Sequence, residues 1–282
     1  MKEARGKLLP FFLLTYAVMW ASFITVAVAR IPVSSPLGVL LLRLGAYSPS
    51  LVAIWLTARA NGGAGVRNLV RGVFKWRVPA RYYVLAIAFI PVIKLSAAVL
   101  QHLASGSWPR SGSESLLLIP LAIAFSTPFQ AGEEIGWRGY ALPRLAERFG
   151  LRAASVILGF IWALWHLPQF FIHEAAEYGQ SFPVFVLQVT ALGVALAWIY
   201  ARTNGSLLLV MLMHSATNNA NFFPSATPGA TNTFGLDASL LAWLTVALLW
   251  LCAGYFLISM PKWAPVADDG RGAAARDLAP SS

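Results

Sequence analysis

Long hydrophobic stretches make up most of the chain, and short segments that hold most of its charged residues separate them. As α-helix, at about 1.5 Å per residue, such stretches can cross the ~30 Å of hydrocarbon in a bilayer. We expect eight spans, near residues 8–29, 38–58, 82–103, 115–141, 153–172, 182–201, 206–222 and 237–259. The pattern therefore predicts an all-α fold, a polytopic membrane helical bundle with about eight transmembrane helices.

The composition agrees with a protein that lies in a membrane. Hydrophobic residues make up 58% of the 282 positions, charged residues 11%, and the mean hydropathy is +0.65. A water-soluble domain has roughly twice that charged share. We expect an integral membrane protein of a bacterial or archaeal cell membrane. Residues 1–263 should form a single transmembrane domain with a catalytic core at 115–222, and 264–282 a disordered cytoplasmic tail.

The basic residues alternate along the chain. They precede the first span and follow the second, fourth, sixth and eighth: Lys2, Arg5, Lys7; Arg59, Arg67, Arg71, Lys75, Arg77, Arg81; Arg144, Arg148, Arg152; Arg202; Lys262, Arg271, Arg276. Because cytoplasmic loops collect Lys and Arg, both termini should be cytoplasmic. This bias, together with the attraction of basic loops to anionic lipid headgroups, accounts for the net charge of +10. We therefore expect the lipid bilayer as a partner and do not expect nucleic-acid binding.

Three polar pairs occur inside the expected spans, each with a spacing of four residues: Glu134 with Arg138, Trp162 with His166, and His214 with Asn218. Residues four apart lie on the same face of a helix. Each pair can therefore point towards one interior site. Ionisable groups inside a membrane are energetically costly and usually functional.

Of the 11 acidic residues, only Glu133 and Glu134 fall in a segment that we place inside the hydrocarbon, since Asp237 stands at the first position of the last span. Two adjacent carboxylates cannot both ionise freely in a medium of low dielectric constant. Arg138 is four residues from Glu134 and five from Glu133, so Glu134 should form the ion pair and Glu133 should remain as a general base. The alternative is that both acids only neutralise arginines and hold helices together.

Two histidines in the spans weigh against a purely structural role. Glu133, His166 and His214 could activate water, or they could bind a divalent metal such as zinc and leave one position for water. Asn218 adds a neutral donor that is suited to stabilising an oxyanion. Either histidine alone would more often be a core residue whose hydrogen bonds are satisfied.

Prolines lie close to two of these motifs, since Pro128 precedes the acidic pair and Pro168 follows His166. Proline removes a backbone hydrogen bond and opens a helical turn. The prolines therefore indicate either backbone that lines a cavity or ordinary kinks.

These motifs resemble those of the CPBP family, the intramembrane CAAX-protease and bacteriocin-processing proteins, which also includes abortive-infection-like membrane proteins. The family's Glu-Glu-x-x-x-Arg appears as Glu133-Glu134-Ile-Gly-Trp-Arg138, its Phe-x-x-x-His as Trp162-Ala-Leu-Trp-His166, and its His-x-x-x-Asn as His214-Ser-Ala-Thr-Asn218. One departure is Trp162 in place of Phe, which we expect to alter pocket shape more than chemistry.

The resemblance implies an intramembrane endopeptidase with a cytoplasm-facing cavity. Glu133 and His166 would activate water there, His214 and Asn218 would stabilise the oxyanion, and Glu134 and Arg138 would support the site. The substrate would be a peptide or protein, with prenylated or membrane-tethered proteins as candidates. Two mechanisms are debated for the family, one with a metal ion and one with glutamate-activated water alone. Both use these residues.

Two other classes of function stay open. Buried Glu and His also build proton relays, so a proton-coupled transporter is one alternative. A non-catalytic, immunity-type protein that binds a membrane peptide is the other. Lys94, in the middle of the third span, could neutralise a glutamate, line the cavity or extend towards the membrane surface.

Overall fold

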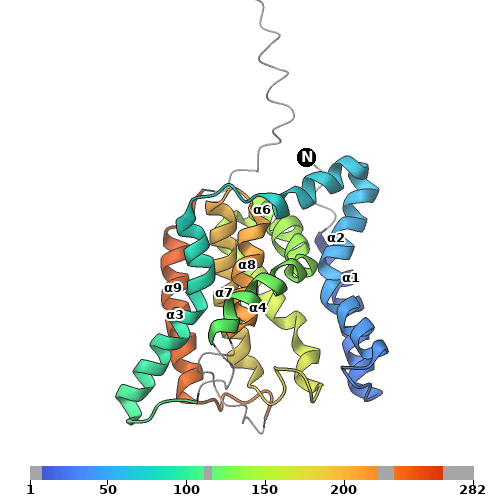
Figure 1. Cartoon of the computed structure of the whole chain (residues 1–282). Coiled ribbons are helices and arrows are strands. Elements are labelled where there is room, and N and C mark those ends of the chain that lie inside the picture. Colours follow the sequence, from blue (N-terminus) through green and yellow to red (C-terminus); the bar gives the residue numbers. More distant parts are fainter. Residues whose placement is uncertain (1–7, 111–115, 221–231, 263–282) are drawn as a thin grey trace, which may run out of the picture.

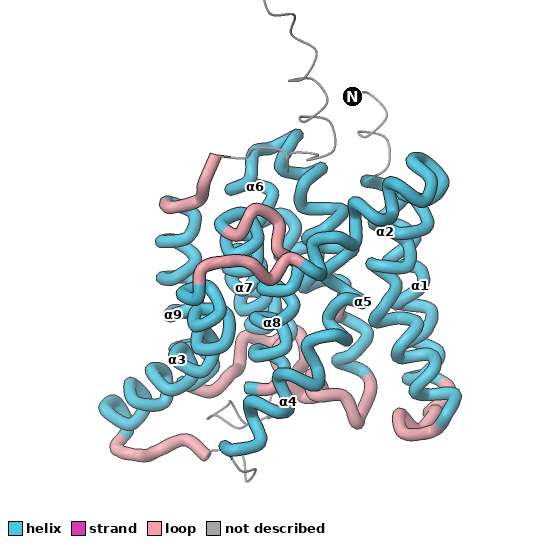
Figure 2. The backbone as a smooth tube through the Cα atoms, turned by 45° about the horizontal axis from the view of Figure 1, so that its top comes forward, coloured by secondary structure: helices cyan, strands magenta, loops and turns pink. Residues whose placement is uncertain are grey.

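The computed structural model describes residues 8–110, 116–220 and 232–262 (Figure 1). The predicted tail, 264–282, lies outside these residues. Throughout the described part, helices are joined by loops (Figure 2). The helices are α1 (Leu8–Val28), α2 (Pro36–Val70), α3 (Ala80–Ser105), α4 (Ile119–Ser126), α5 (Ala131–Glu134), α6 (Leu142–Trp165), α7 (Phe182–Arg202), α8 (Leu207–Asn218) and α9 (Leu240–Ile258).

Six helical segments of the described chain are long and apolar enough to cross a membrane, and α8 is a shorter apolar helix. The segment Ile119–Phe171 is 53 residues long and covers most of the fourth and of the fifth expected span. Its backbone leaves the helical conformation at Gly150, where φ is +75°, and the chain then runs back along the bundle (Figure 1). The prediction of a polytopic helical bundle is confirmed.

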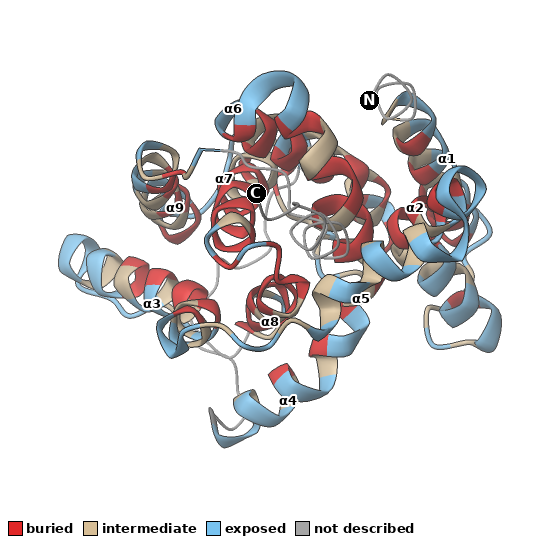
Figure 3. Cartoon of the chain, turned by 90° about the horizontal axis from the view of Figure 1, so that it is seen from above, coloured by how far each residue is buried: buried red, intermediate tan, exposed pale blue. Residues whose placement is uncertain are grey.

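Many apolar side chains of the spans face outwards, whereas a pair of charged side chains lies inside. Leu13, Leu121 and Leu251 are each more than 60% exposed, whereas Glu134 and Arg138 are at most 1% exposed. Helices α7 and α8 lie at the centre of the bundle, with α1, α3, α4 and α9 around them (Figure 3). An apolar exterior around a polar interior is the arrangement expected of a protein solvated by lipid.

One end of the bundle collects the basic segments. Four hydrogen bonds join them: Lys75 to Asn204, Ser206 to Lys75, Arg152 to Ile258 and Arg202 to Ser259. We call this the basic end. Since α7 finishes at Arg202, its first residue, Phe182, lies at the opposite end of the bundle. The shared position of these segments is what the alternation of Lys and Arg requires.

The helix that carries the acidic pair is irregular. A 3₁₀ turn, Thr127–Gln130, precedes α5, and a π-helix, Ile135–Ala141, follows it. Ser50 of α2 bonds to the backbone on both sides of the acids, because its Oγ donates to the carbonyl of Ala131 (2.7 Å) and accepts from the amide of Gly136 (3.1 Å). Irregular backbone at membrane depth is tolerated where neighbouring groups satisfy it in this way.

Glycines let α2 approach this segment closely. A Cβ atom built on Gly136 would lie 2.4 Å from the backbone carbon of Pro49, and one built on Gly132 would lie 2.2 Å from the ring of Tyr47. Small residues commonly permit such close helix contacts in membranes. The contact holds α2 against the segment that carries Glu133 and Glu134.

Fusions to a topology reporter test the orientation of the bundle. We expect fusions after Lys75 and Arg148 to report the cytoplasm, and fusions near Arg110 and Gly179 to report the other side, because of the Lys and Arg bias. Activity of alkaline phosphatase and of a cytoplasmic fluorescent reporter would be measured in parallel. The reversed pattern at either pair would contradict this orientation.

Gly136→Ala tests the approach of α2. We expect it to lower the stability by at least ~1–3 kcal/mol, because the added methyl group meets backbone that cannot easily move. Gly254→Ala is the matched control, since a Cβ atom there meets nothing within 4 Å. It should be neutral or stabilise α9 by up to about 1 kcal/mol. Thermal unfolding in detergent measures both, and equal behaviour of the two variants would contradict the packing argument.

Candidate active site

Glu134 forms the ion pair that its spacing from Arg138 predicts. Nη1 of Arg138 donates to both carboxylate oxygens of Glu134, at 2.9 and 3.0 Å. The guanidinium also lies over the ring of Trp162, with its Cζ atom 4.3 Å from the ring centroid. Both charged groups are buried, so each depends on the other for compensation.

His214 joins the same carboxylate from a different helix. Its Nδ1 lies 2.7 Å from Oε1 of Glu134. Because a carboxylate that is paired with arginine only accepts hydrogen bonds, Nδ1 carries a hydrogen and donates it. The bond leaves Nε2 as the second functional atom of the ring.

Glu133 does not lie within ion-pair distance of Arg138, and its Oε2 accepts a hydrogen bond from Nε1 of Trp162 at 2.8 Å. The division of roles between the two acids that spacing suggests therefore agrees with this geometry. The expectation that Trp162 alters shape more than chemistry does not. A phenylalanine has no N–H group, so the indole supplies a donor to Glu133 that the usual residue of the motif cannot supply.

His166 is oriented by the backbone of its own helix. Its Nδ1 lies 2.7 Å from the carbonyl oxygen of Trp162. A carbonyl only accepts, so Nδ1 is the protonated nitrogen and Nε2 of the neutral ring keeps its lone pair. The rings of His166 and His214 both meet Trp162 edge-on, with centroids 5.5 and 5.2 Å away. Trp162 thus contacts Glu133, Arg138 and both histidines of the three motifs.

Asn218 lies one turn after His214, at the end of α8. Its Nδ2 is 3.4 Å from Oε1 of Gln130, which is a long and weak hydrogen bond. The amide is thus only loosely held. Gln130, which is buried at the end of the 3₁₀ turn, is a neighbour that the motif spacing does not reveal.

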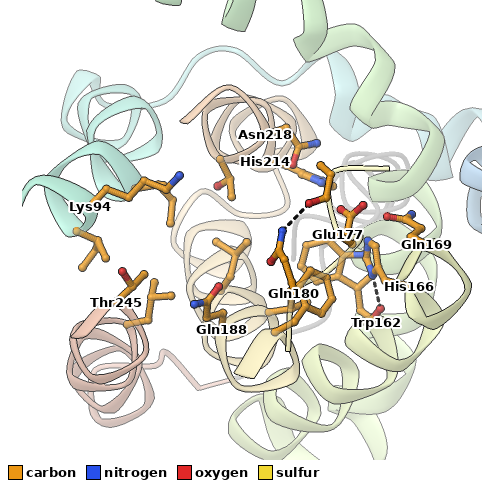
Figure 4. A pocket seen from close by; sticks show the side chains of 18 of the residues that line it. Lys94, Trp162, His166, Gln169, Glu177, Gln180, Gln188, His214, Asn218 and Thr245 are labelled. Carbon is orange, nitrogen blue, oxygen red and sulfur yellow. Dashed lines mark hydrogen bonds between the residues drawn. The ribbon is translucent and has the colours of Figure 1, made fainter. Parts of the chain in front are cut away.

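A cavity of about 400 Å³ brings the predicted groups together. Glu133, Trp162, His166, His214 and Asn218 line it, and other walls carry Lys94, Gln180, Gln188 and Thr245 (Figure 4). Glu134 and Arg138 stand behind this lining, bonded to His214 and packed against Trp162. The volume falls in the range of ligand-binding pockets.

The cavity extends from the middle of the bundle towards the end opposite the basic end. Ala176, Glu177 and Gln180, which precede α7, line it, and α7 reaches the basic end only at Arg202. Gly139, six residues after Glu133, lies beside Leu207, since a Cβ atom built on Gly139 would be 3.3 Å from Cδ1 of Leu207. Ser206, next to Leu207, bonds to Lys75 at the basic end, so Glu133 is about 9 Å from that level at 1.5 Å per residue. The cytoplasm-facing opening of the cavity stays a prediction.

Glu177 is a cavity residue that sequence reasoning missed. It lies between spans, where an acid is usually solvated, and no helical spacing relates it to the three motifs. With its amide turned towards the carboxylate, Gln169 donates to both oxygens of Glu177, at 3.1 and 2.9 Å. Burial raises the pKa of Glu177, and the charge of Glu133 raises this pKa further. The carboxyl group therefore belongs to the electrostatics of the site.

The predicted metal ligands were tested against this geometry. In the part of the chain that the structure describes, no group of three or more His, Cys, Asp or Glu side chains is arranged to hold a metal ion. Glu133, His166 and His214 line one cavity but do not form such a cluster. The residues as placed do not fit a zinc site, so we derive no step through a metal.

Known proteins share these features. Residues 113–220 match the model of a family described as type II CAAX prenyl endopeptidase Rce1-like. Over 226 residues, 74% of this chain and 81% of the relative, the sequence is 26% identical to "CAAX prenyl protease 2" of Methanococcus maripaludis. The family match contains all three motifs.

Glu134→Gln tests the buried ion pair. The amide leaves the charge of Arg138 uncompensated, so we expect a loss of stability of ~3–5 kcal/mol. The measurement is thermal unfolding in detergent, with Glu133→Gln as the matched control, because that acid lacks the arginine partner. Equal stability of the two variants would contradict the assigned division of roles.

Proposed function

Because the chain belongs to the CPBP family of membrane proteases, we propose that it is an intramembrane endopeptidase in which Glu133 and His166 activate water within the cavity. One observation carries the proposal. Glu133 remains outside the ion pair of Arg138 and shares a cavity with the unsubstituted Nε2 of His166. A carboxylate and an imidazole that face one space are the groups needed to deprotonate and orient water.

Hydrolysis begins with a water molecule between these two groups. Oε2 of Glu133 is held by Trp162, which leaves Oε1 to take a proton from the water. Nε2 of His166 accepts a hydrogen bond from the second hydrogen of the water, and this bond orients a lone pair of the water oxygen towards the substrate. The resulting hydroxide attacks the peptide carbonyl carbon, and the carbonyl oxygen becomes an oxyanion.

The oxyanion needs donors, and α8 supplies them. Nδ2 of Asn218 is weakly held and can turn to the oxyanion. His214 also lines the cavity, and its Nε2 donates to the oxyanion when that nitrogen carries a hydrogen. As the tetrahedral intermediate breaks its C–N bond, Glu133 returns its proton to the leaving nitrogen, which completes hydrolysis without another cofactor.

The substrate is a peptide or protein that reaches the cavity within the membrane. The relative's name, a CAAX prenyl protease, supports a substrate with a lipid-modified carboxyl-terminal region. The apolar exterior of the bundle is compatible with a substrate held in the bilayer. We propose a membrane-tethered polypeptide, with a prenylated one as a candidate.

Glu133→Gln separates a protease from a passive binder or a transporter. We expect the variant to fold and bind peptide but to lose hydrolysis, because an amide cannot accept the proton. His166→Ala should behave alike, and Asn218→Ala should retain turnover reduced ~100- to 1,000-fold. Cleavage of a membrane-tethered reporter peptide and thermal stability would be measured together.

Two outcomes would contradict the proposal. Full cleavage by folded Glu133→Gln would remove Glu133 as the base. Absence of cleavage by the wild type across a broad peptide screen, with binding retained, would favour an immunity-type binding protein.

A further inference from the structure

Lys94 lies in the middle of α3 and lines the same cavity as the catalytic groups. Its Nζ donates to the carbonyl oxygen of Ala220, just beyond α8, at 2.9 Å. No carboxylate of the described residues lies within ion-pair distance of it. Of the roles that the sequence leaves open for Lys94, the geometry therefore supports lining the cavity. It does not show Lys94 neutralising a glutamate.

The bond to Ala220 accounts for only part of the ammonium group. A lysine has three N–H donors, and one carbonyl uses one of them. The negative end of the α8 dipole adds some stabilisation, but it does not replace an anion. A cation without a carboxylate partner inside a membrane is costly and usually serves a function.

The charges of the cavity are separated across it. Lys94 and Thr245 lie on one side, and His166 and Glu177 lie on the other, with Gln180 and Gln188 between (Figure 4). Glu133 lies on the same side of the cavity as His166, because its carboxylate is bonded to Trp162, one helical turn before His166. An anionic group on a ligand is repelled by the two glutamates and attracted to Lys94. The uncharged polar groups between them suit the backbone of a peptide.

We propose that Lys94 binds a carboxylate of the peptide substrate and so sets which peptides are cleaved. The inference rests on the proposed peptidase function and deepens it. The carboxylate lies across the cavity from the scissile bond, and it is either the carboxyl terminus of the substrate or an acidic side chain. A charge-assisted hydrogen bond of this kind contributes about 10- to 100-fold to recognition.

The experiment compares three peptides of one sequence: one with a free carboxyl terminus, one with a terminal amide, and one with a terminal amide and an added aspartate. We expect kcat/KM of the wild type to be ~10- to 100-fold higher for a carboxylate-bearing peptide than for the plain amide. Lys94→Met should abolish this preference and leave cleavage of the plain amide within about threefold, whereas Lys94→Arg should retain part of it.

Lys75→Met is the matched control. Nζ of Lys75 also donates to a backbone carbonyl at 2.9 Å, that of Asn204, but at the basic end and outside the cavity. This variant loses the same charge and the same kind of bond, so it should keep the wild-type preference. The peptide that is preferred identifies the source of the carboxylate.

Binding measured in the Glu133→Gln background keeps the test independent of catalysis. Fluorescence anisotropy of the same peptides should show the same ~10- to 100-fold preference, lost in Glu133→Gln/Lys94→Met. Equal handling of all three peptides by the wild type, or an equal loss for all of them in Lys94→Met, would overturn the role of Lys94 alone. Binding without any cleavage by the wild type would instead overturn the proposed function.

Discussion

The carboxylate of Glu134 is the group on which the rest of the site depends. It accepts hydrogen bonds from Arg138 of its own segment and from His214 of α8, and it is fully buried. Because it compensates the arginine, the neighbouring Glu133 is left without that partner. Because it binds His214, the imidazole is held in one tautomer. One buried acid therefore determines the chemical state of three other side chains.

The membrane gives this network its importance. In water, an exposed ion pair contributes little, since solvent replaces a lost partner. Inside a bundle whose exterior faces lipid, a lost partner is replaced by nothing. The same reasoning applies to the backbone, where Ser50 satisfies groups on both sides of the acids. The same few polar atoms therefore stabilise the fold and position the groups of the site.

Local spacing predicts part of this site and cannot predict the rest. The Glu134–Arg138 pair follows from the four-residue rule, and the common end of the basic segments follows from the loop charges. The bond from Trp162 to Glu133 joins residues 29 apart, and its partner depends on how two helices pack. Glu177 enters the cavity from a loop whose path has no periodic signal.

The π-helix Ile135–Ala141 sets the angle between two halves of one span. Each residue of a helix turns the chain by about 100°, so an extra residue in a turn rotates everything after it relative to everything before it. Glu133 and Glu134 precede the π-helix, whereas Gly150 and the reversal towards His166 follow it. A lineage that lost one of residues 139–141 would keep its hydrophobicity and all three motifs, yet would turn its acids relative to Trp162 and His166. Intact motifs in a sequence comparison would then accompany an inactive protein, and only the length of the segment between them would reveal it.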